Sequence, residues 1–466
     1  MRCGIHDNDR MKAYFAREAL LPGGWARNVR MVVDGRGDFA EVTPDAQGGE
    51  PLAGPALPGM PSLHSHAFQR AMAGLTETRG DLRDDFWSWR ELMYSFVAKL
   101  TPELAFAIAR HLYVDMLKHG YTAVGEFHYV HNEIDGTPYS PAAELGLRHL
   151  EAARTAGIAI TMLPALYAHA NFERVPLLAR QQRFRSTPEV LLGMAAQIKR
   201  ACGADPDCAV GIAPHSLRAV GPAELAELLA GVRSLGENTP IHIHAAEQLR
   251  EVEDCIAWSG KRPVEWLLES AGVDRRWCVV HATHMTPEET RGLAASGAVA
   301  GLCPATEANL GDGIFPLLEY RAALGCYGIG GDSHYSRDPI EELRLLEYVQ
   351  RLAHGRRNLV VGGHSAAVGT TLWLEAAAGG AQALGRRCGR IEAGARADLV
   401  VLDAARADLS RCTGDGIANA LIFSGSTGLV REVAVAGRWL VRSGRHPDEE
   451  QVERDYAGAL HELLAA

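Results

Sequence analysis

Residues 63–70 read Leu-His-Ser-His-Ala-Phe-Gln-Arg, and this stretch decides the fold. It follows an apolar run over residues 51–60 that is punctuated by proline and glycine, a pattern that predicts a short buried strand leading into a turn. Side chains two residues apart in a strand point to the same face, so the imidazoles of His64 and His66 can reach one ion. By itself such a pair is more often two ordinary surface or core histidines.

Three later positions make a metal site the better interpretation of this histidine pair. His244, in the segment His-Ile-His-Ala-Ala-Glu over residues 242–247, is followed along the chain by His281 and Asp332. Each of the three stands at the C-terminal end of a short apolar run. With the first histidine pair they form an ordered set of imidazoles and one carboxylate, which favours a metal site over isolated histidines.

The bulk properties exclude several classes of protein. A chain of 466 residues is longer than one hydrophobic core usually serves, so one large domain with a smaller one is expected. The net charge is −10 and the sequence has no basic blocks, so it shows no sign of a nucleic-acid binding surface. No apolar run reaches the ~20 residues that a membrane span needs. No segment resembles a signal peptide, and the nine cysteines are scattered without a CxxC pair, which predicts reduced thiols in a cytoplasmic protein.

The pattern of the sequence divides the chain into four stretches. Residues 1–10 are polar and aperiodic, which predicts an extension that is a candidate for disorder, and residues 11–57 hold short β-like runs separated by turns. Residues 58–385 alternate helical patterns with eight short apolar runs, which predicts a (β/α)8 TIM-like barrel of the α/β class. Residues 386–466 return to β-like runs and end in a predicted closing helix that begins at residue 457. Active residues of such barrels lie at C-terminal strand ends, where the histidines fall.

Three longer motifs carry a resemblance to a known family. Residues 63–74, 86–94 and 303–313 resemble the formimidoylglutamate deiminases of the amidohydrolase superfamily, and the resemblance extends from about residue 11 to the C-terminus. It implies that both chain ends join in one small β-sandwich beside the barrel and that the protein is a homodimer. It also implies an activity: hydrolysis of N-formimidoyl-L-glutamate to N-formyl-L-glutamate and ammonia in histidine degradation.

The resemblance assigns roles at the metal site. It implies that His64, His66, His244 and Asp332 bind one divalent ion, most simply Zn2+, with an open position for water. The ion lowers the pKa of this water, so metal-activated hydroxide becomes the nucleophile. Relatives with two metals bridge them through a lysine at the fourth strand end; here Pro-His stands at residues 214–215, so we predict a single metal. The ligand set also admits iron or manganese.

Three residues carry the predicted proton transfers. The resemblance makes His281 the general base, Asp332 a proton acceptor as well as a ligand, and Glu247 the shuttle to the imine nitrogen of the substrate. Ammonia leaves a tetrahedral centre only once its nitrogen is protonated, so the reaction needs such a shuttle. The alternatives are a core or metal-ligating histidine at position 281 and, for the His-x-x-Glu spacing, a surface pair on a helix.

Five residues match family positions that contact the substrate: Gln69, Arg90, Tyr129, His215 and Arg218. A small-molecule dicarboxylate needs fixed cationic donors, and guanidinium groups bind carboxylates in a bidentate way. Without the resemblance, each arginine would be interpreted as a surface residue.

Other residues and other functions stay open. His242, two residues before His244 on the same strand, is predicted to be structural; Trp87 and Trp89 are expected to pack in a lid, and His334 has no assigned role. Two rival functions are a deaminase of a ring substrate, of the cytosine, guanine or triazine type, and a catalytically silent scaffold. The paired arginines argue against the ring substrate, and the filled ligand positions argue against the scaffold. The sequence does not decide between glutamate and aspartate derivatives.

Overall fold

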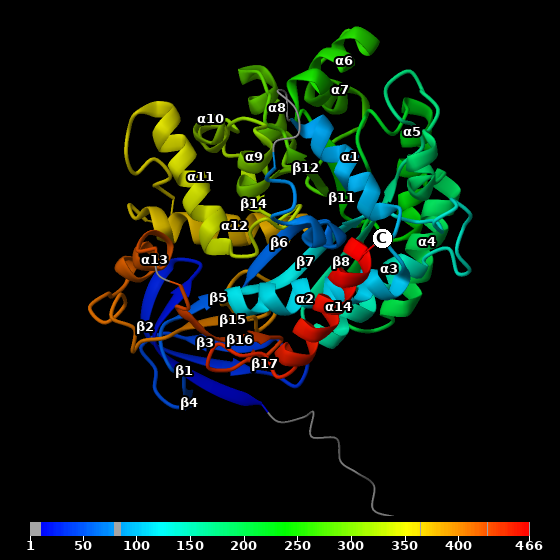
Figure 1. The fold of residues 1–466 in the computed structure, drawn as a ribbon. Helices are drawn as coiled ribbons and strands as arrows, with labels where there is room; N and C mark the ends of the chain where they lie inside the picture. Colours follow the sequence, from blue (N-terminus) through cyan, green and yellow to red (C-terminus); the bar gives the residue numbers. More distant parts are fainter. Residues whose placement is uncertain (1–10, 79–84, 364, 426, 466) are drawn as a thin grey trace, which may run out of the picture.

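The computed structural model describes residues 11–78, 85–363, 365–425 and 427–465. They form a barrel of strands ringed by helices and, beside it, a sheet in which N-terminal strands lie next to C-terminal ones (Figure 1). This arrangement confirms the predicted fold class, an α/β barrel with a small β-unit made from both chain ends. The predicted extension lies outside the described residues.

Eight strand positions form the barrel, and every pairing within it is parallel. All eight apolar runs of the sequence form strands. Most of them are short runs of buried residues, which both faces of a parallel sheet accept, whereas the residues of β9 are half-buried. The strands are β6 (Met60–Ser65), β7 (Tyr121–His128), β8 (Ala159–Leu166), β9 (Cys208–Val210) with β10 (Ala213–Pro214), β11 (Ile241–Ala245), β12 (Trp277–His281), β13 (Val299–Leu302) and β14 (Cys326–Ile329).

The barrel closes at two seams between its two four-position sheets. At the first seam, the backbone N–H of His66 donates to the carbonyl of Asp332 (2.9 Å), and the N–H of Asp332 donates to the carbonyl of His64 (3.1 Å). At the second seam, the N–H of His244 donates to the carbonyl of His215 (3.1 Å). Both seams therefore run through residues that the sequence assigns to the metal site.

Helices cover the outside of the barrel, and their ends follow ordinary capping rules. In the helix that follows Thr101, the threonine side chain accepts from the N–H of Leu104, Pro102 stands at the first position, and Gly120 ends the helix with φ 104°. The helices of this part of the chain are η2 (Ala67–Met72), α1 (Phe86–Val97), α2 (Pro102–His119), α3 (Glu144–Ala156), η3 (Ala179–Phe184), α4 (Pro188–Cys202), α5 (Pro222–Gly231), η4 (Val232–Ser234), α6 (Leu249–Ser259), α7 (Pro263–Ser270), α8 (Pro287–Ser296), α9 (Pro304–Leu310), α10 (Leu317–Ala322), α11 (Pro339–His354) and α12 (Val368–Ala383).

The second sheet joins the two ends of the chain. Its central contact pairs the early strand β5 with the late strand β15 in antiparallel fashion, with Leu57 opposite Val400. The sheet has its own apolar core, which includes Tyr14, Met31 and Phe39. Its strands are β1 (Lys12–Leu21), β2 (Gly24–Val33), β3 (Phe39–Thr43), β4 (Glu50–Pro51), β5 (Ala56–Pro58), β15 (Leu399–Leu402), β16 (Val430–Val435) and β17 (Arg438–Val441), and α13 (Asp415–Phe423) lies between β15 and β16.

The closing helix is longer than the sequence predicted. It is α14 (Glu449–Ala465), which begins eight residues before the predicted start and packs along α2 (Figure 1). Val452, Ala459 and Leu463 are buried at helical spacing, so the apolar stripe starts within the first turn. Lys118 of α2 pairs with Glu449 at 3.1 Å and fixes this first turn.

One expectation about the cysteines was wrong. The sequence predicted reduced thiols throughout, but Cys202 and Cys208 form a disulfide between the end of α4 and β9. Their sequence numbers differ by six, and the turn between α4 and β9 brings their Cα atoms to 5.5 Å, a proximity that scattered spacing did not reveal. Among the helices described, none is long and apolar enough to cross a membrane.

The packing of α12 against the barrel predicts an unusual sensitivity to one methyl group. A Cβ at Gly379 would lie 1.8 Å from the carbonyl oxygen of Tyr327 in β14, whereas a Cβ at Gly193 in α4 would meet nothing within 4 Å. We expect Gly379→Ala to lower the free energy of unfolding by about 3 kcal/mol, since the helix must move away from the strand. Gly193→Ala should raise it by about 0.5–1 kcal/mol. Chemical denaturation of both variants checks this, and equal effects would contradict the tight contact.

Candidate metal centre

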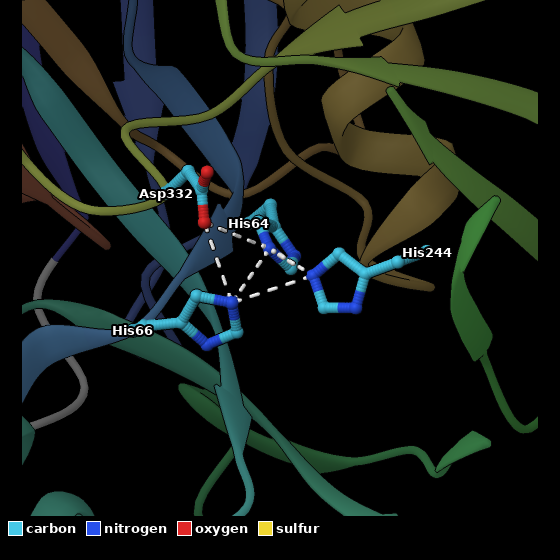
Figure 2. Close-up of side chains that lie close together, drawn as sticks. All are labelled: His64, His66, His244 and Asp332. Atoms are coloured by element: carbon cyan, nitrogen blue, oxygen red, sulfur yellow. Dashed lines mark hydrogen bonds and ion pairs between the residues drawn. The ribbon is translucent and has the colours of Figure 1, made fainter. Parts of the chain in front are cut away.

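Four side chains from distant parts of the chain converge on one point at the carboxyl ends of the strands (Figure 2). The Nε2 atoms of His64, His66 and His244 lie 3.1–3.4 Å from one another. Oδ1 of Asp332 lies 3.3 Å from Nε2 of both His64 and His66. All four side chains are buried. The structure thus brings together the complete predicted ligand set.

The donor set fits a divalent cation. Four ligands about 2.0–2.1 Å from a tetrahedral metal lie about 3.3 Å apart, which matches the observed spacing. Nδ1 of His66 donates to the carbonyl of Phe127 (2.8 Å) and Nδ1 of His244 to that of His215 (2.9 Å), so each Nε2 keeps its lone pair. Burial lowers the pKa of all three histidines, and the neighbouring imidazoles lower that of His64 further. They are therefore neutral, as metal ligands must be.

His281 ends β12 on the far side of Asp332 and is surrounded by acids. Its Nδ1 lies 3.2 Å from Oε1 of Glu307, and its Nε2 lies 3.7 Å from Oε1 of Glu247 and 4.0 Å from Oδ2 of Asp332. Burial alone would lower the pKa of His281, but these three carboxylates together raise it to about 10. Glu307 is itself held by the N–H of Cys303 at 2.9 Å, so it fixes the ring orientation of His281.

Glu247 is buried at the same place. Burial raises the pKa of Glu247 to about 7, against the lowering effect of His281 and Arg218. Asp312 lies beside it, with one oxygen hydrogen-bonded to the side chain of Gln248, and burial and the charge of Glu247 raise the pKa of Asp312 to about 9. The sequence interpretation gave no role to Glu307 or Asp312. Both belong to the motif over residues 303–313, and two acids directly after the seventh strand are the signal that could have found them.

The backbone around the centre is strained. Five non-glycine residues adopt left-handed φ values there: Ala246 (53°), His281 (67°), Ala282 (49°), Asp332 (50°) and His334 (57°). Such a conformation costs about 1–3 kcal/mol per residue and persists only where surrounding hydrogen bonds impose it. Each of these residues lies at or shortly past the end of a barrel strand, where the candidate ligands and His281 also lie.

The five predicted substrate residues line one cavity above the metal ligands. Gln69 comes from η2, Arg90 from α1, and Tyr129, His215 and Arg218 from segments that follow strands. Sequence reasoning missed Tyr94 of α1 and Tyr167 beyond β8, because single tyrosines in helices and loops carry no signal. The cavity is lined by His66, Gln69, Phe86, Trp89, Arg90, Met93, Tyr94, Tyr129, Tyr167, Phe184, His215, Arg218, His244, Glu247, His281, Leu310, Asp332 and Ser333.

Polar contacts fix several of these side chains. Nε2 of Gln69 donates to the hydroxyl of Tyr129 (2.9 Å), and the hydroxyl of Ser333 donates to Oε1 of Gln69 (2.6 Å). The guanidinium of Arg218 is buried, lies 4.0 Å from Oε2 of Glu247, and has no protein acceptor for its Nε among the described residues. The guanidinium of Arg90 lies 4.8 Å from the ring centre of Trp87. These cations face a cavity that offers them few anionic partners.

The remaining candidates lie outside the reacting centre. Nε2 of His242 contacts the carbonyl of Ala383 (2.8 Å), and His242 does not belong to the group of four candidate ligands, which is consistent with its predicted structural role. Nε2 of His334 lies 2.7 Å from the hydroxyl of Ser65, in a buried network behind the ligands. Trp89 donates to the hydroxyl of Tyr335 (2.7 Å) and also lines the cavity.

Comparisons with known proteins agree with this geometry. Residues 56–440 match the family model described as "Amidohydrolase family", and residues 11–52 match "Formimidoylglutamate deiminase HutF, N-terminal domain". The chain is 52% identical to a formimidoylglutamate deiminase of Pseudomonas aeruginosa, over 97% of this chain and all of that one. It is 29% identical to a 5-methylthioadenosine/S-adenosylhomocysteine deaminase of Natronomonas pharaonis, over 88% and 87% of the two chains. An amidohydrolase crystal structure from Brucella melitensis matches with a TM-score of 0.91 and 46% identity, over 97% of this chain and all of that one.

Two histidines on one strand give a matched test of the metal centre. His244→Gln removes one of four ligands, and we expect metal affinity to fall at least about 100-fold, because ligand loss costs more than loss of its supporting contacts. His242→Gln lies two residues away on the same strand but outside the ligand set, so it should keep the metal content of the unchanged protein. Elemental analysis after dialysis against a chelator measures both. Equal metal content in the two variants would contradict the assigned ligand set.

Proposed function

The chain belongs to the amidohydrolase family, among the formimidoylglutamate deiminases, and we propose that it hydrolyses N-formimidoyl-L-glutamate to N-formyl-L-glutamate and ammonia. One observation carries this proposal: a buried acid–imidazole pair, Glu247 and His281, shares a cavity with the guanidinium groups of Arg90 and Arg218. The pair is suited to proton transfer, and the arginines are suited to an anionic substrate.

The chemistry sets what the residues must do. Water adds its oxygen to the formimidoyl carbon, the bond from that carbon to the terminal nitrogen breaks, and both water hydrogens end on the nitrogen as it leaves as ammonia. A divalent ion at the His64, His66, His244 and Asp332 set would supply water activation at neutral pH. The protein must then carry protons from the side of attack to the leaving nitrogen.

Glu247 and His281 stand where this transfer is needed. Nε2 of His281 lies 4.0 Å from Oδ2 of Asp332 and 3.7 Å from Oε1 of Glu247. Its raised pKa favours the protonated ring, so His281 can pass its proton toward Glu247 and then regain one beside the ligand set. Because burial raises the pKa of Glu247 to about 7, its carboxyl group can both hold and release a proton at neutral pH. Glu307 holds His281 in this orientation.

Substrate recognition follows from the donors around the cavity. Arg90 and Arg218 offer guanidinium groups, and Gln69, Tyr129 and His215 offer further polar atoms. A substrate with two carboxylates can satisfy both groups of donors, since a carboxylate accepts hydrogen bonds only. We propose that these five residues hold the carboxylates while Glu247 and His281 act at the formimidoyl end.

Finer features remain part of the proposal. We infer a single Zn2+ per chain, because three imidazoles and one carboxylate suit a borderline-soft ion and no lysine stands at residues 214–215. The division into parts over residues 11–57, 58–385 and 386–466, a homodimer and a cytoplasmic location also stay predictions. Elemental analysis and light scattering address the metal and the oligomeric state.

Comparison of substrates tests the proposed reaction directly. We expect ammonia release from N-formimidoyl-L-glutamate with a kcat/KM at least about 10^4-fold above that for cytosine, guanine or a triazine, because a site built for charged acceptors rejects a neutral ring. N-formimidoyl-L-aspartate serves as a shortened dicarboxylate. A ring substrate that exceeds both linear amidines would overturn the proposal, and no turnover of any amidine by the metal-loaded protein would favour the silent scaffold.

Replacement of the shuttle residue tests the proton path. Glu247→Gln keeps the shape of the side chain but cannot release a proton, so kcat should fall by about 10^2–10^4-fold while metal content stays unchanged. Glu253→Gln, on the exposed face of α6, is the matched control and should leave turnover at the level of the unchanged enzyme. Steady-state ammonia assays and elemental analysis provide both readouts. Unimpaired turnover by Glu247→Gln would refute the role of this carboxyl group.

A further inference from the structure

We propose that Gln181 is a positioning residue that aims the hydroxyl hydrogens of Tyr94 and Tyr167 into the cavity, where they donate to one carboxylate of the substrate. This inference rests on the proposed function and deepens it. Beside the arginines already placed in the cavity, it adds two hydroxyl groups that determine specificity and the glutamine that orients them.

Gln181 lies in η3 and is fully buried. Its Oε1 accepts from the backbone N–H of Leu178 (3.0 Å). Its Nε2 donates to the hydroxyl oxygens of Tyr94 (3.1 Å) and Tyr167 (3.3 Å). Because a backbone N–H can only donate, the contact with Leu178 fixes which end of the amide is oxygen. The NH2 group therefore faces the two tyrosines.

The orientation of the amide decides the orientation of the hydroxyl hydrogens. An NH2 group has two hydrogens, and here one is available for each tyrosine. A hydroxyl group that accepts from Gln181 must direct its own hydrogen elsewhere. Within the described parts of the chain, neither Tyr94 nor Tyr167 has a protein acceptor for that hydrogen. Both side chains line the cavity, so the two hydrogens are available to a bound ligand.

The charge around these hydroxyls selects the ligand. The guanidinium of Arg90 lies 5.7 Å from the ring centre of Tyr94, and Arg218 lines the same cavity. Burial raises the pKa of Tyr167 to about 12, although Arg90 and Arg218 act to lower it, so its hydroxyl stays protonated and remains a donor. Two O–H donors beside two guanidinium groups match a carboxylate, which accepts only; a neutral ring with N–H groups of its own would leave these donors unpaired.

The arrangement also explains the burial of Gln181. A fully buried amide is costly unless its hydrogen bonds are made, and here its oxygen and both of its amide hydrogens have partners. An apolar residue at position 181 could fill the same space, but it would leave both hydroxyl groups free to turn toward the protein or toward water.

The test reverses the donor at position 181. Gln181→Glu places an acceptor where the NH2 group stood, so the tyrosine hydrogens turn back toward residue 181 and away from the substrate. We expect kcat/KM for N-formimidoyl-L-glutamate to fall about 100-fold, mainly through KM, and about 10-fold for Tyr94→Phe and for Tyr167→Phe, as expected for lost hydrogen bonds to a charged group. Gln182→Glu makes the same change one residue away, outside the cavity lining, and should leave kcat/KM unchanged.

Substrate analogues separate recognition from a structural effect. N-formimidoyl-4-aminobutyrate lacks the α-carboxylate, and N-formimidoyl-2-aminobutyrate lacks the side-chain carboxylate. The analogue that lacks the carboxylate bound by the tyrosines should show the same kcat/KM with the unchanged protein and with all three variants. The other analogue should still show the reduced kcat/KM in each variant. A penalty of equal size on both analogues, or none on the dicarboxylate, would overturn it. The tyrosine variants keep their rings, so they report even where Gln181→Glu does not fold.

Failure of the proposed function is distinguishable from failure of this inference. If the unchanged protein releases no ammonia from N-formimidoyl-L-glutamate, the reaction is wrong, yet the carboxylate contact is still measurable by calorimetry with N-formyl-L-glutamate as the probe. The inference is supported if the unchanged protein binds this probe and if Tyr94→Phe and Tyr167→Phe each bind it about 10-fold more weakly. No binding, or equal binding by all variants, contradicts it.

Discussion

The backbone hydrogen bonds that join His64 and His66 to Asp332 are the constraint on which the rest of the structure depends. They close the barrel at its first seam, and the hydrogen bond from His244 to His215 closes the second. Because the same residues provide the metal-binding atoms, formation of the barrel also forms the donor set. The conformational entropy of ordering ligands from distant parts of the chain is therefore lost during folding, before any ion binds. The left-handed φ of Asp332 is held by this seam.

Burial then divides the centre into two electrostatic halves. On the ligand side, desolvation keeps His64, His66 and His244 neutral. On the opposite side, acids surround His281 and raise its pKa, because a buried positive charge there has carboxylate partners. Asp332 lies between the halves, with Oδ1 toward the ligands and Oδ2 toward His281. A single carboxylate thus links the candidate metal ligands with the acids and imidazole to which we assign proton transfer.

Local patterns and the family resemblance account for most of what could be predicted from the sequence. The alternation of apolar runs and helical stretches predicted the barrel, and the spacing of His64 and His66 predicted a shared face. What could not be predicted depends on pairs that only the fold brings together. The disulfide of Cys202 with Cys208 and the contact of Gln181 with two tyrosines leave no periodic trace. The early start of α14 was missed because its apolar stripe is sparse.

Part of the proposed substrate recognition lies on elements that do not build the barrel. The ligands and His281 stand at strand ends, where a closed sheet fixes them, whereas Arg90 and Tyr94 stand on α1 and Gln181 on η3. If these residues act as proposed, changes in α1 or η3 should alter which molecule fits while the seams of the barrel stay intact. The names of two relatives are consistent with such a division, since the 5-methylthioadenosine/S-adenosylhomocysteine deaminase and the formimidoylglutamate deiminase are named for different substrates. In the proposed function, part of the specificity therefore lies on α1 and η3, and the reacting groups lie at or just past the ends of the barrel strands.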